Sequence, residues 1–212
     1  MQLGLAAGCA AAPAKEKENE EVAPAEDLMR EHGLLNRVLL IYEEVERRIA
    51  ASRDFKPESL AAAAGIVRHF IEDYHEKLEE EHLFPRFRKA HRLVDLVDTL
   101  DAQHKAGRRE TGITLQLATA AALKDPGNRS RLAASLGRFI RMYRPHEARE
   151  DTVLFPALHQ IVSPHEYAAL GEQFEKREHQ LFGEEGFEKM VDRVAGLEKE
   201  FGIYDLAQFT PA

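Results

Sequence analysis

The chain has 212 residues, a net charge of −8 and 44% hydrophobic residues, a composition typical of one large domain or of one domain with extensions. The negative charge excludes the basic face that nucleic-acid binding requires, and no apolar run approaches the length of a membrane-spanning helix. The single cysteine, Cys9, excludes an internal disulfide framework and a thiolate-rich metal site, so any bound metal must use imidazole and carboxylate ligands.

A separate region is expected over 1–25. Small apolar residues over 3–13 precede a polar stretch over 15–27, and Cys9 follows two alanines and Gly8. This order resembles the end of a bacterial lipoprotein signal, which implies a lipid on Cys9 as the chain's contact with a membrane. A disordered tail is the alternative. Localisation therefore stays open between the cytoplasm and, if Cys9 is lipidated, an extracytoplasmic lipoprotein.

Apolar residues recur at helical spacing along most of the chain from Glu26 onward, and no segment alternates with the period of a strand. Breaks at residues 54–59, 85–91 and 124–128 contain proline or other turn residues and separate four helices. The sequence therefore predicts an all-α fold, with an up-down-up-down four-helix bundle over residues 26–162.

Residues 163–212 are expected to form a C-terminal helical extension packed on the bundle. Ser163 and Glu166 have the spacing of a capping box, with Pro164 at the first helical position. Two amphipathic helices follow, divided at Gly183, and the chain ends in a short tail.

The second and fourth expected helices contain the same motif. The segment from His75 to Pro85 aligns without gaps on the segment from His146 to Pro156, and both share His-Glu-x-x-Glu and Leu-Phe-Pro. Almost the same offset that relates these two copies also relates His32 to His104. Each half of the bundle therefore contributes one histidine and then His-x-x-x-Glu.

The turns of the predicted bundle place these four histidines at one level. In an antiparallel helix pair, residues equidistant from the turn lie at the same height. The first and second histidines have their midpoint between Arg53 and Asp54, the second and third between Lys89 and Ala90, and the third and fourth at Asp125. All three midpoints lie in predicted breaks, so the histidines are expected to meet.

Residues four apart share a helix face, so Glu79 and Glu150 are expected to point inward beside His75 and His146. A lone histidine on an apolar stripe is more often a core residue than a ligand, and most helical glutamates are solvated. Two buried carboxylates without partners would cost several kcal/mol each, whereas bound metal ions would compensate their charge. The predicted metal ligands are His32, His75, Glu79, His104, His146 and Glu150.

This set of residues resembles the bacterial hemerythrin-like domains, also called HHE cation-binding domains, over residues 27–161. The resemblance implies a four-helix bundle that holds a non-haem di-iron centre. It implies two iron ions joined by an Fe–O–Fe or hydroxo bridge, ahead of manganese or zinc, with Glu79 and Glu150 as bridging carboxylates.

The chain also departs from the oxygen-carrying members of that family. The carriers have a second histidine four residues after the third-helix histidine, whereas this chain has Arg108 there, which puts reversible oxygen carriage in doubt. Glu76 or Glu147 could supply a replacement ligand. The carriers use His-x4-Asp in the last helix, so Asp151 stays an alternative to Glu150.

Four histidines and two bridging carboxylates supply about eight bonds, whereas two six-coordinate ions have about twelve positions. The open positions would accept a small ligand such as O2, peroxide or NO. One hypothesis is a protein that binds or senses dioxygen, iron or redox state without turnover. The others are a di-iron enzyme that reduces peroxide or nitric oxide, and a structural metal site, which the open positions disfavour. No catalytic residue and no oligomeric state are predicted.

Overall fold

The computed structural model describes residues 23–211, which are helical apart from turns and short connections. No residue in that range belongs to a strand, which confirms the predicted all-α class. The lipoprotein-like segment around Cys9 lies outside the described residues. None of the helices in residues 23–211 is long and apolar enough to cross a membrane.

The helical part before residue 160 consists of four long segments, as the turn signals predicted. The first is α1 (Pro24–Ala50). The second is a continuous helical rod in which two parts have the wider π-helical hydrogen bonding: α2 (Pro57–Ile66), η1 (Val67–His75, π), α3 (Glu76–Leu78), η2 (Glu79–Leu83, π) and α4 (Phe84–Lys89). The third segment is α5 (Val94–Leu117), followed by a short 3-10 turn, η3 (Ala122–Lys124). The fourth comprises α6 (Pro126–Arg149), the π-helical η4 (Glu150–Leu154) and α7 (Phe155–Leu158).

The two short π-helical parts, η2 and η4, occur at matching places in the repeat. Each begins at a predicted ligand, Glu79 or Glu150, and ends two residues before a proline, Pro85 or Pro156. A proline has no N–H, and its ring collides with the carbonyl four residues earlier. Re-spacing the hydrogen bonds of the preceding turn lets the helix continue through the proline.

The break expected over residues 85–91 therefore starts later than predicted. The helix runs through Pro85 to Lys89, and the chain turns over the next four residues before α5 begins. His91 and Leu93 in this turn have φ angles of 51° and 53°, the left-handed conformation that ends a helical path.

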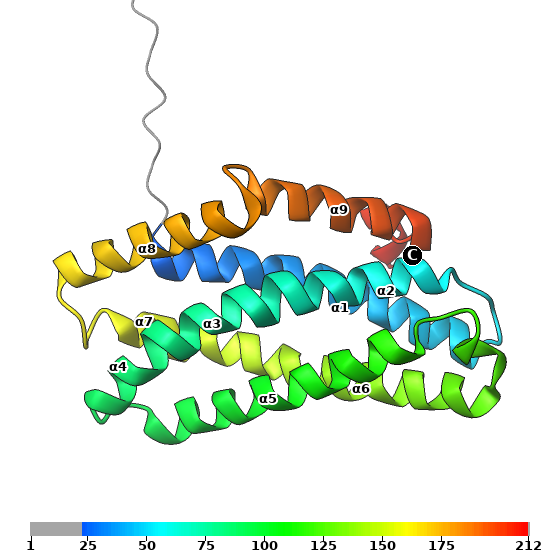
Figure 1. Cartoon of the computed structure of the whole chain (residues 1–212), viewed down its shortest axis with the longest axis horizontal. Coiled ribbons are helices and arrows are strands. Elements are labelled where there is room, and N and C mark those ends of the chain that lie inside the picture. Colours follow the sequence, from blue (N-terminus) through cyan, green and yellow to red (C-terminus); the bar gives the residue numbers. More distant parts are fainter. Residues whose placement is uncertain (1–22, 212) are drawn as a thin grey trace, which may run out of the picture.

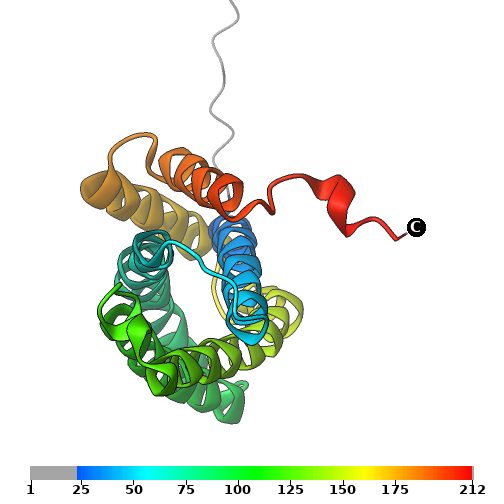
Figure 2. The same ribbon diagram turned by 90° about the vertical axis from the view of Figure 1, so that its right-hand side faces the viewer.

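The four long segments lie side by side around one interior (Figures 1 and 2). α1 packs against α6 and the α2–η1 part of the rod, and α5 packs against α6 and the other side of the rod. The interior is filled by large side chains that are fully buried, among them Leu39, Tyr42, Phe70, Phe87 and Phe139.

Two further helices, α8 (Pro164–Phe182) and α9 (Gly186–Phe201), lie along the outside of α1 (Figure 1). α8 begins as predicted, because the Ser163 hydroxyl accepts a hydrogen bond from the Glu166 amide at 3.2 Å. It ends at Gly183, whose φ of 83° suits a residue without a side chain. A last 3-10 turn, η5 (Leu206–Phe209), follows α9.

The contact between α9 and α1 includes an ion pair with two hydrogen bonds. Arg37 on α1 donates from Nε and Nη2 to the two carboxylate oxygens of Glu198 on α9, at 3.0 and 2.6 Å. Arg48 donates to the main-chain carbonyl of Phe201 at 2.6 Å. Paired Arg–carboxylate bonds of this kind fix orientation as well as distance, so α9 is held in register along α1.

Candidate metal centre

The four predicted histidines come from four different helical segments and meet in the interior. All are at most 4% exposed. His32 of α1 and His75 of η1 form a first pair, with ring centroids 4.7 Å apart, and His104 of α5 and His146 of α6 form a second pair, 5.0 Å apart. In the second pair the two Nε2 atoms lie 3.3 Å from each other.

The two predicted glutamates lie between these pairs. Glu79 Oε2 is 3.7 Å from His75 Nε2 and 3.4 Å from His104 Nε2. Glu150 Oε2 is 3.4 Å from His32 Nε2 and 3.1 Å from His146 Nε2. Each carboxylate therefore reaches one histidine of each pair through its Oε2 atom.

The spacing of the donor atoms fits metal ions. Donors bound to one ion at about 2.1 Å, with bond angles between right-angled and tetrahedral, lie about 3.0 to 3.4 Å apart. The four histidine–carboxylate separations, from 3.1 to 3.7 Å, are close to this range. Among the groups of three whose donor atoms lie within 4.8 Å of one another are His32, His75 and Glu79, and His104, His146 and Glu150; a further group at this site joins His104 to Glu76 and Glu80.

Within residues 23–211, the histidine rings are the only groups near the carboxylate oxygens of Glu79 and Glu150 that could balance their charge. Both oxygens of Glu79 and both of Glu150 are buried, and none makes a hydrogen bond within residues 23–211. Burial and the neighbouring Glu150 charge raise the pKa of Glu79 well above its usual range, whereas at Glu150 burial is outweighed by His146 and His32, which lower its pKa. Because buried carboxylates without compensation cost several kcal/mol, metal binding is the chemistry that this donor set fits.

The other ring nitrogen of each histidine, Nδ1, contacts a polar side chain outside the donor set. Such contacts fix the ring orientation and keep the proton on Nδ1, so that Nε2 can face a metal. The contacts are His32 with Asp151 at 2.7 Å, His75 with Glu31 at 2.6 Å, His104 with Glu80 at 3.1 Å and His146 with Gln103 at 2.9 Å.

These outer contacts follow the same internal repeat. Asp151 is the counterpart of Glu80 in the aligned motif copies. Gln103 is the counterpart of Glu31, and these two residues each stand directly before a predicted ligand histidine. Each half therefore supports one histidine of its own and one of the other half. The two halves differ in charge at one of these positions, because Glu31 has a carboxylate whereas its counterpart Gln103 has a neutral amide. Sequence reasoning missed both of these residues, although their position next to a ligand histidine was a signal that could have identified them.

The residues considered as extra or alternative ligands have other contacts as well, and their role as ligands stays a prediction. Asp151 contacts Nδ1 of His32, on the far side of the ring from Glu150. Glu76 accepts a hydrogen bond from the Tyr143 hydroxyl at 2.5 Å and forms an ion pair with Arg108 at 2.7 Å. These contacts give Asp151 and Glu76 partners outside the donor set.

Glu147 has an equivalent partner in the other half. It accepts a hydrogen bond from Asn36, which is the counterpart of Arg108 in the repeat because it follows the first-helix histidine by the same number of positions. Arg108 therefore does more than replace a histidine: with Asn36 it forms a repeated pair of donors that hold Glu76 and Glu147.

Comparison with known proteins agrees with this arrangement. The sequence model of the hemerythrin HHE cation-binding domain matches residues 23–111 and 95–209. Proteins named only as uncharacterized, from Mycobacterium tuberculosis and Mycobacterium bovis, are 50% identical over 197 residues, covering 93% of this chain and 77% of theirs. No solved structure matches the chain. The family match spans nearly all the described residues and includes every residue of the site, so the chain belongs to the hemerythrin HHE cation-binding family.

Proposed function

We propose that this protein holds two non-haem iron ions and uses them to bind or sense dioxygen, or to respond to iron or redox state, without turnover. The observation that carries the proposal is that Glu79 and Glu150 each reach both histidine pairs. The predicted up-down-up-down bundle is part of this proposal, because it brings one histidine from each segment to the same level.

The donor set leaves room for a small ligand. Each ion would receive two imidazoles and one oxygen from each glutamate, which leaves about two positions of a six-coordinate ion for O2, peroxide or NO. Iron in such a site supplies a centre that can change its oxidation state and bind these ligands.

The protein side chains orient the donors and exclude water from them. Phe155 stacks on His32 at 5.6 Å and Phe84 stacks on His104 at 5.4 Å, again as a repeated pair. Both phenylalanines are fully buried. The Nδ1 contacts and these stacked rings restrict rotation of the imidazoles, so the donors are held ready before a metal binds.

The test is metal analysis of the full chain after anaerobic loading with Fe²⁺, together with its optical spectrum before and after exposure to oxygen. We expect two irons per chain and an oxygen-dependent spectrum that reverses under argon. His104→Ala should lose iron, whereas the matched control His69→Ala, an exposed histidine of η1, should keep it.

Three results would count against the proposal. Retention of no transition metal would contradict the metal centre, and so would unchanged iron content in His104→Ala. Steady-state turnover of peroxide or nitric oxide by the iron-loaded chain would replace binding or sensing with the enzymatic alternative.

A further inference from the structure

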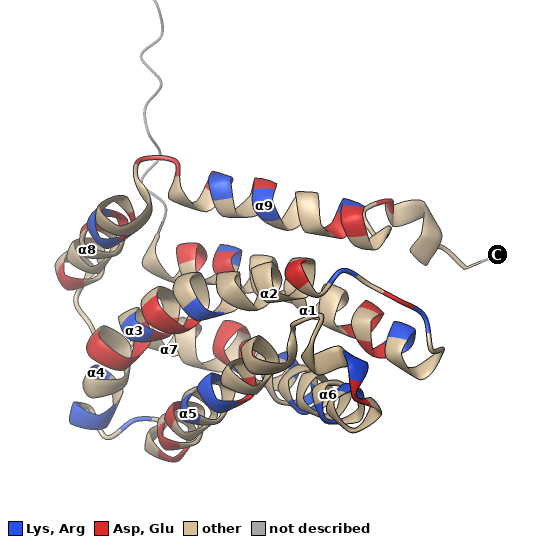
Figure 3. Ribbon diagram, turned by 45° about the vertical axis from the view of Figure 1, so that its right-hand side comes forward, with Lys and Arg blue, Asp and Glu red and all other residues tan. Residues whose placement is uncertain are grey.

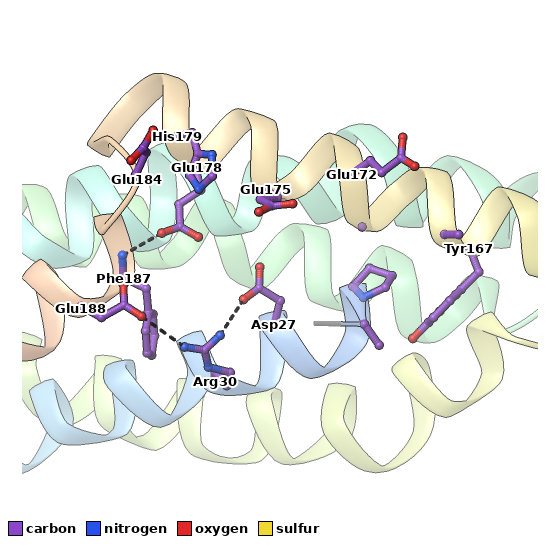
Figure 4. A pocket seen from close by; sticks show the side chains of 14 residues that line it. Asp27, Arg30, Tyr167, Glu172, Glu175, Glu178, His179, Glu184, Phe187 and Glu188 are labelled. Atoms are coloured by element: carbon purple, nitrogen blue, oxygen red, sulfur yellow. Dashed lines mark hydrogen bonds and ion pairs between the residues drawn. The ribbon is translucent and has the colours of Figure 1, made fainter. Parts of the chain in front are cut away.

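A second group of carboxylates lies next to the first histidine pair. Asp27 and Glu31 on α1 and Glu178 on α8 place one oxygen each within 4.8 Å of the others, and we call them the carboxylate cluster. Figure 4 shows Asp27 and Glu178 pointing toward each other across the space between the two helices. Glu31 is 0% and Glu178 9% exposed, so the cluster is withdrawn from solvent.

One buried oxygen of this cluster lacks a partner. Glu31 Oε2 contacts His75, but Glu31 Oε1 is buried without a hydrogen bond to any described residue. The Tyr74 hydroxyl, 0% exposed, lies beside Glu31, and burial, the charges of the three carboxylates and its contact with Glu31 raise its pKa. A buried carboxylate oxygen without a partner is unfavourable, so Glu31 Oε1 indicates a missing ligand at the cluster.

The cluster opens to the surface through an acidic cavity of about 430 Å³ between α1, α8 and α9. Among residues 23–211, six carboxylates line this cavity, whereas Arg30 is its only lysine or arginine. The connection between α8 and α9, drawn red in Figure 3, carries Glu184, one of these six, and Glu185 next to it in the chain. Arg30 forms ion pairs with Asp27 at 3.6 Å and with Glu188 at 3.8 Å. The electrostatic field at the entrance of the cavity therefore favours cations.

The internal repeat does not produce this cluster twice. The offset that relates His32 to His104 carries Asp27 to Thr99 and Glu31 to Gln103, and neither of these counterparts has a carboxylate. Glu178 belongs to α8, outside the two repeated halves. The extension therefore adds negative charge beside the first histidine pair alone.

We propose that the carboxylate cluster binds a third divalent cation, Fe²⁺ or Mn²⁺, and delivers it to the metal pair. Oxygen donors of this number suit such cations. Glu31 belongs to both places, because its Oε2 contacts the predicted ligand His75 and the residue is also a member of the cluster. The delivery step rests on the proposed di-metal function, whereas binding at the cluster does not.

The first test counts Mn²⁺ ions bound by the metal-free full chain, with free Mn²⁺ measured by electron paramagnetic resonance. We expect three ions for the wild type and two for Glu178→Gln and for Asp27→Asn. Gln keeps the oxygen that accepts from the Phe187 amide, so the fold should survive, as circular dichroism would check. Glu172→Gln, an exposed residue lining the same cavity, is the matched control and should keep three.

The second test measures the rate of Fe²⁺ uptake after rapid mixing. Loss of a ligand carboxylate should slow loading of the metal pair in Glu178→Gln by about tenfold relative to Glu172→Gln, the lower end of what removing metal-site contacts costs. Equal rates in these two variants would overturn delivery.

The ion counts separate the two proposals. Equal Mn²⁺ counts in Glu178→Gln and the wild type would overturn the third site while leaving the proposed function intact. A wild type with a single ion, lost in Glu178→Gln and kept in His104→Ala, would support the third site and contradict the di-iron function.

Discussion

Gly107 on α5 lets the ring of Tyr143 lie directly against the helix backbone. A Cβ atom at this position would lie 2.1 Å from the Tyr143 hydroxyl oxygen and 2.8 Å from two ring carbons. The hydroxyl donates to Glu76, a carboxylate that is 1% exposed and next to His75 in the chain. A side chain at residue 107 would therefore displace the donor that this buried carboxylate needs.

We expect Gly107→Ala to lower the free energy of unfolding by about 1–3 kcal/mol, the usual cost of overpacking, even though alanine favours helices. Gly112→Ala on the same helix is the control, because its added Cβ would meet only Arg68 at 3.9 Å. It should gain up to about 1 kcal/mol. Urea denaturation of both variants decides the matter, and equal stability would refute the packing argument.

The number of iron ions that a variant binds shows whether Asp151 or Glu150 is the metal ligand. Because Asp151 contacts Nδ1 of His32, Asp151→Asn should weaken iron binding by about 10–100-fold while the chain still binds two ions at saturation. Asp73→Asn, on the exposed side of η1, should change neither value. A saturated Asp151→Asn chain with one iron would instead make Asp151 a ligand.

At the scale of elements, the stability of α8 depends on the capping of its first turn as well as on its contacts with α1 and α9. The Ser163 hydroxyl caps the first turn, and α8 carries Glu178 to the carboxylate cluster from near its other end. The cap satisfies a main-chain N–H that would otherwise have no partner in the helix.

We expect Ser163→Ala to lower the free energy of unfolding by about 1 kcal/mol, as loss of an N-cap usually does. Ser130→Ala is the control, because Ser130 is exposed and bonds the carbonyl of Pro126 within the first turn of α6. Equilibrium denaturation monitored by circular dichroism would compare them. A Ser163→Ala chain as stable as the control would show that the cap contributes nothing.

For the whole molecule, the buried carboxyl groups set the response to pH. Burial, the largest cause in each case, raises the pKa of Asp27 to about 7 and that of Glu31, Glu76 and Glu147 to about 8. The folded metal-free chain therefore keeps protons that the unfolded chain releases near pH 4. Their contribution to stability is complete below that pH and is lost as the pH rises toward 8.

We accordingly expect the melting temperature of the metal-free chain to fall between about pH 6.5 and pH 8, by about 2–4 °C for each kcal/mol lost. At lower pH the lowered pKa values of His75 and His104, caused mainly by burial, act in the opposite direction. Added Mn²⁺ or Fe²⁺ should raise it more at the higher pH, because metal binding displaces protons. Burial opposes ionisation of Glu80, but contacts with His104 and Lys77 lower its pKa to about 2, so it titrates below this window. Calorimetry that found the metal-free chain more stable at pH 8 would contradict the prediction.

The sequence predicted the helices well because their signals are local. The first break is predicted over residues 54–59 and α1 ends shortly before it at Ala50, and the capping box at Ser163 and the break at Gly183 lie where predicted. The repeat also identified six side chains that the structure brings together, although their role as metal ligands stays a prediction. The break after Pro85 was misplaced, because the π-helical turn before that proline has no signal in single-residue preferences.

What the sequence determined by itself was the helical class, most of the helix ends and the six side chains that meet in the interior, because periodicity and a fixed offset can be counted along one dimension. Only the tertiary structure decided that Glu79 reaches His104 on another segment and that Asp151 supports His32 from the opposite half. It also brought Glu178 of the extension to Glu31. Such contacts depend on how far each helix is rotated and shifted against its neighbours, which packing sets and local sequence does not.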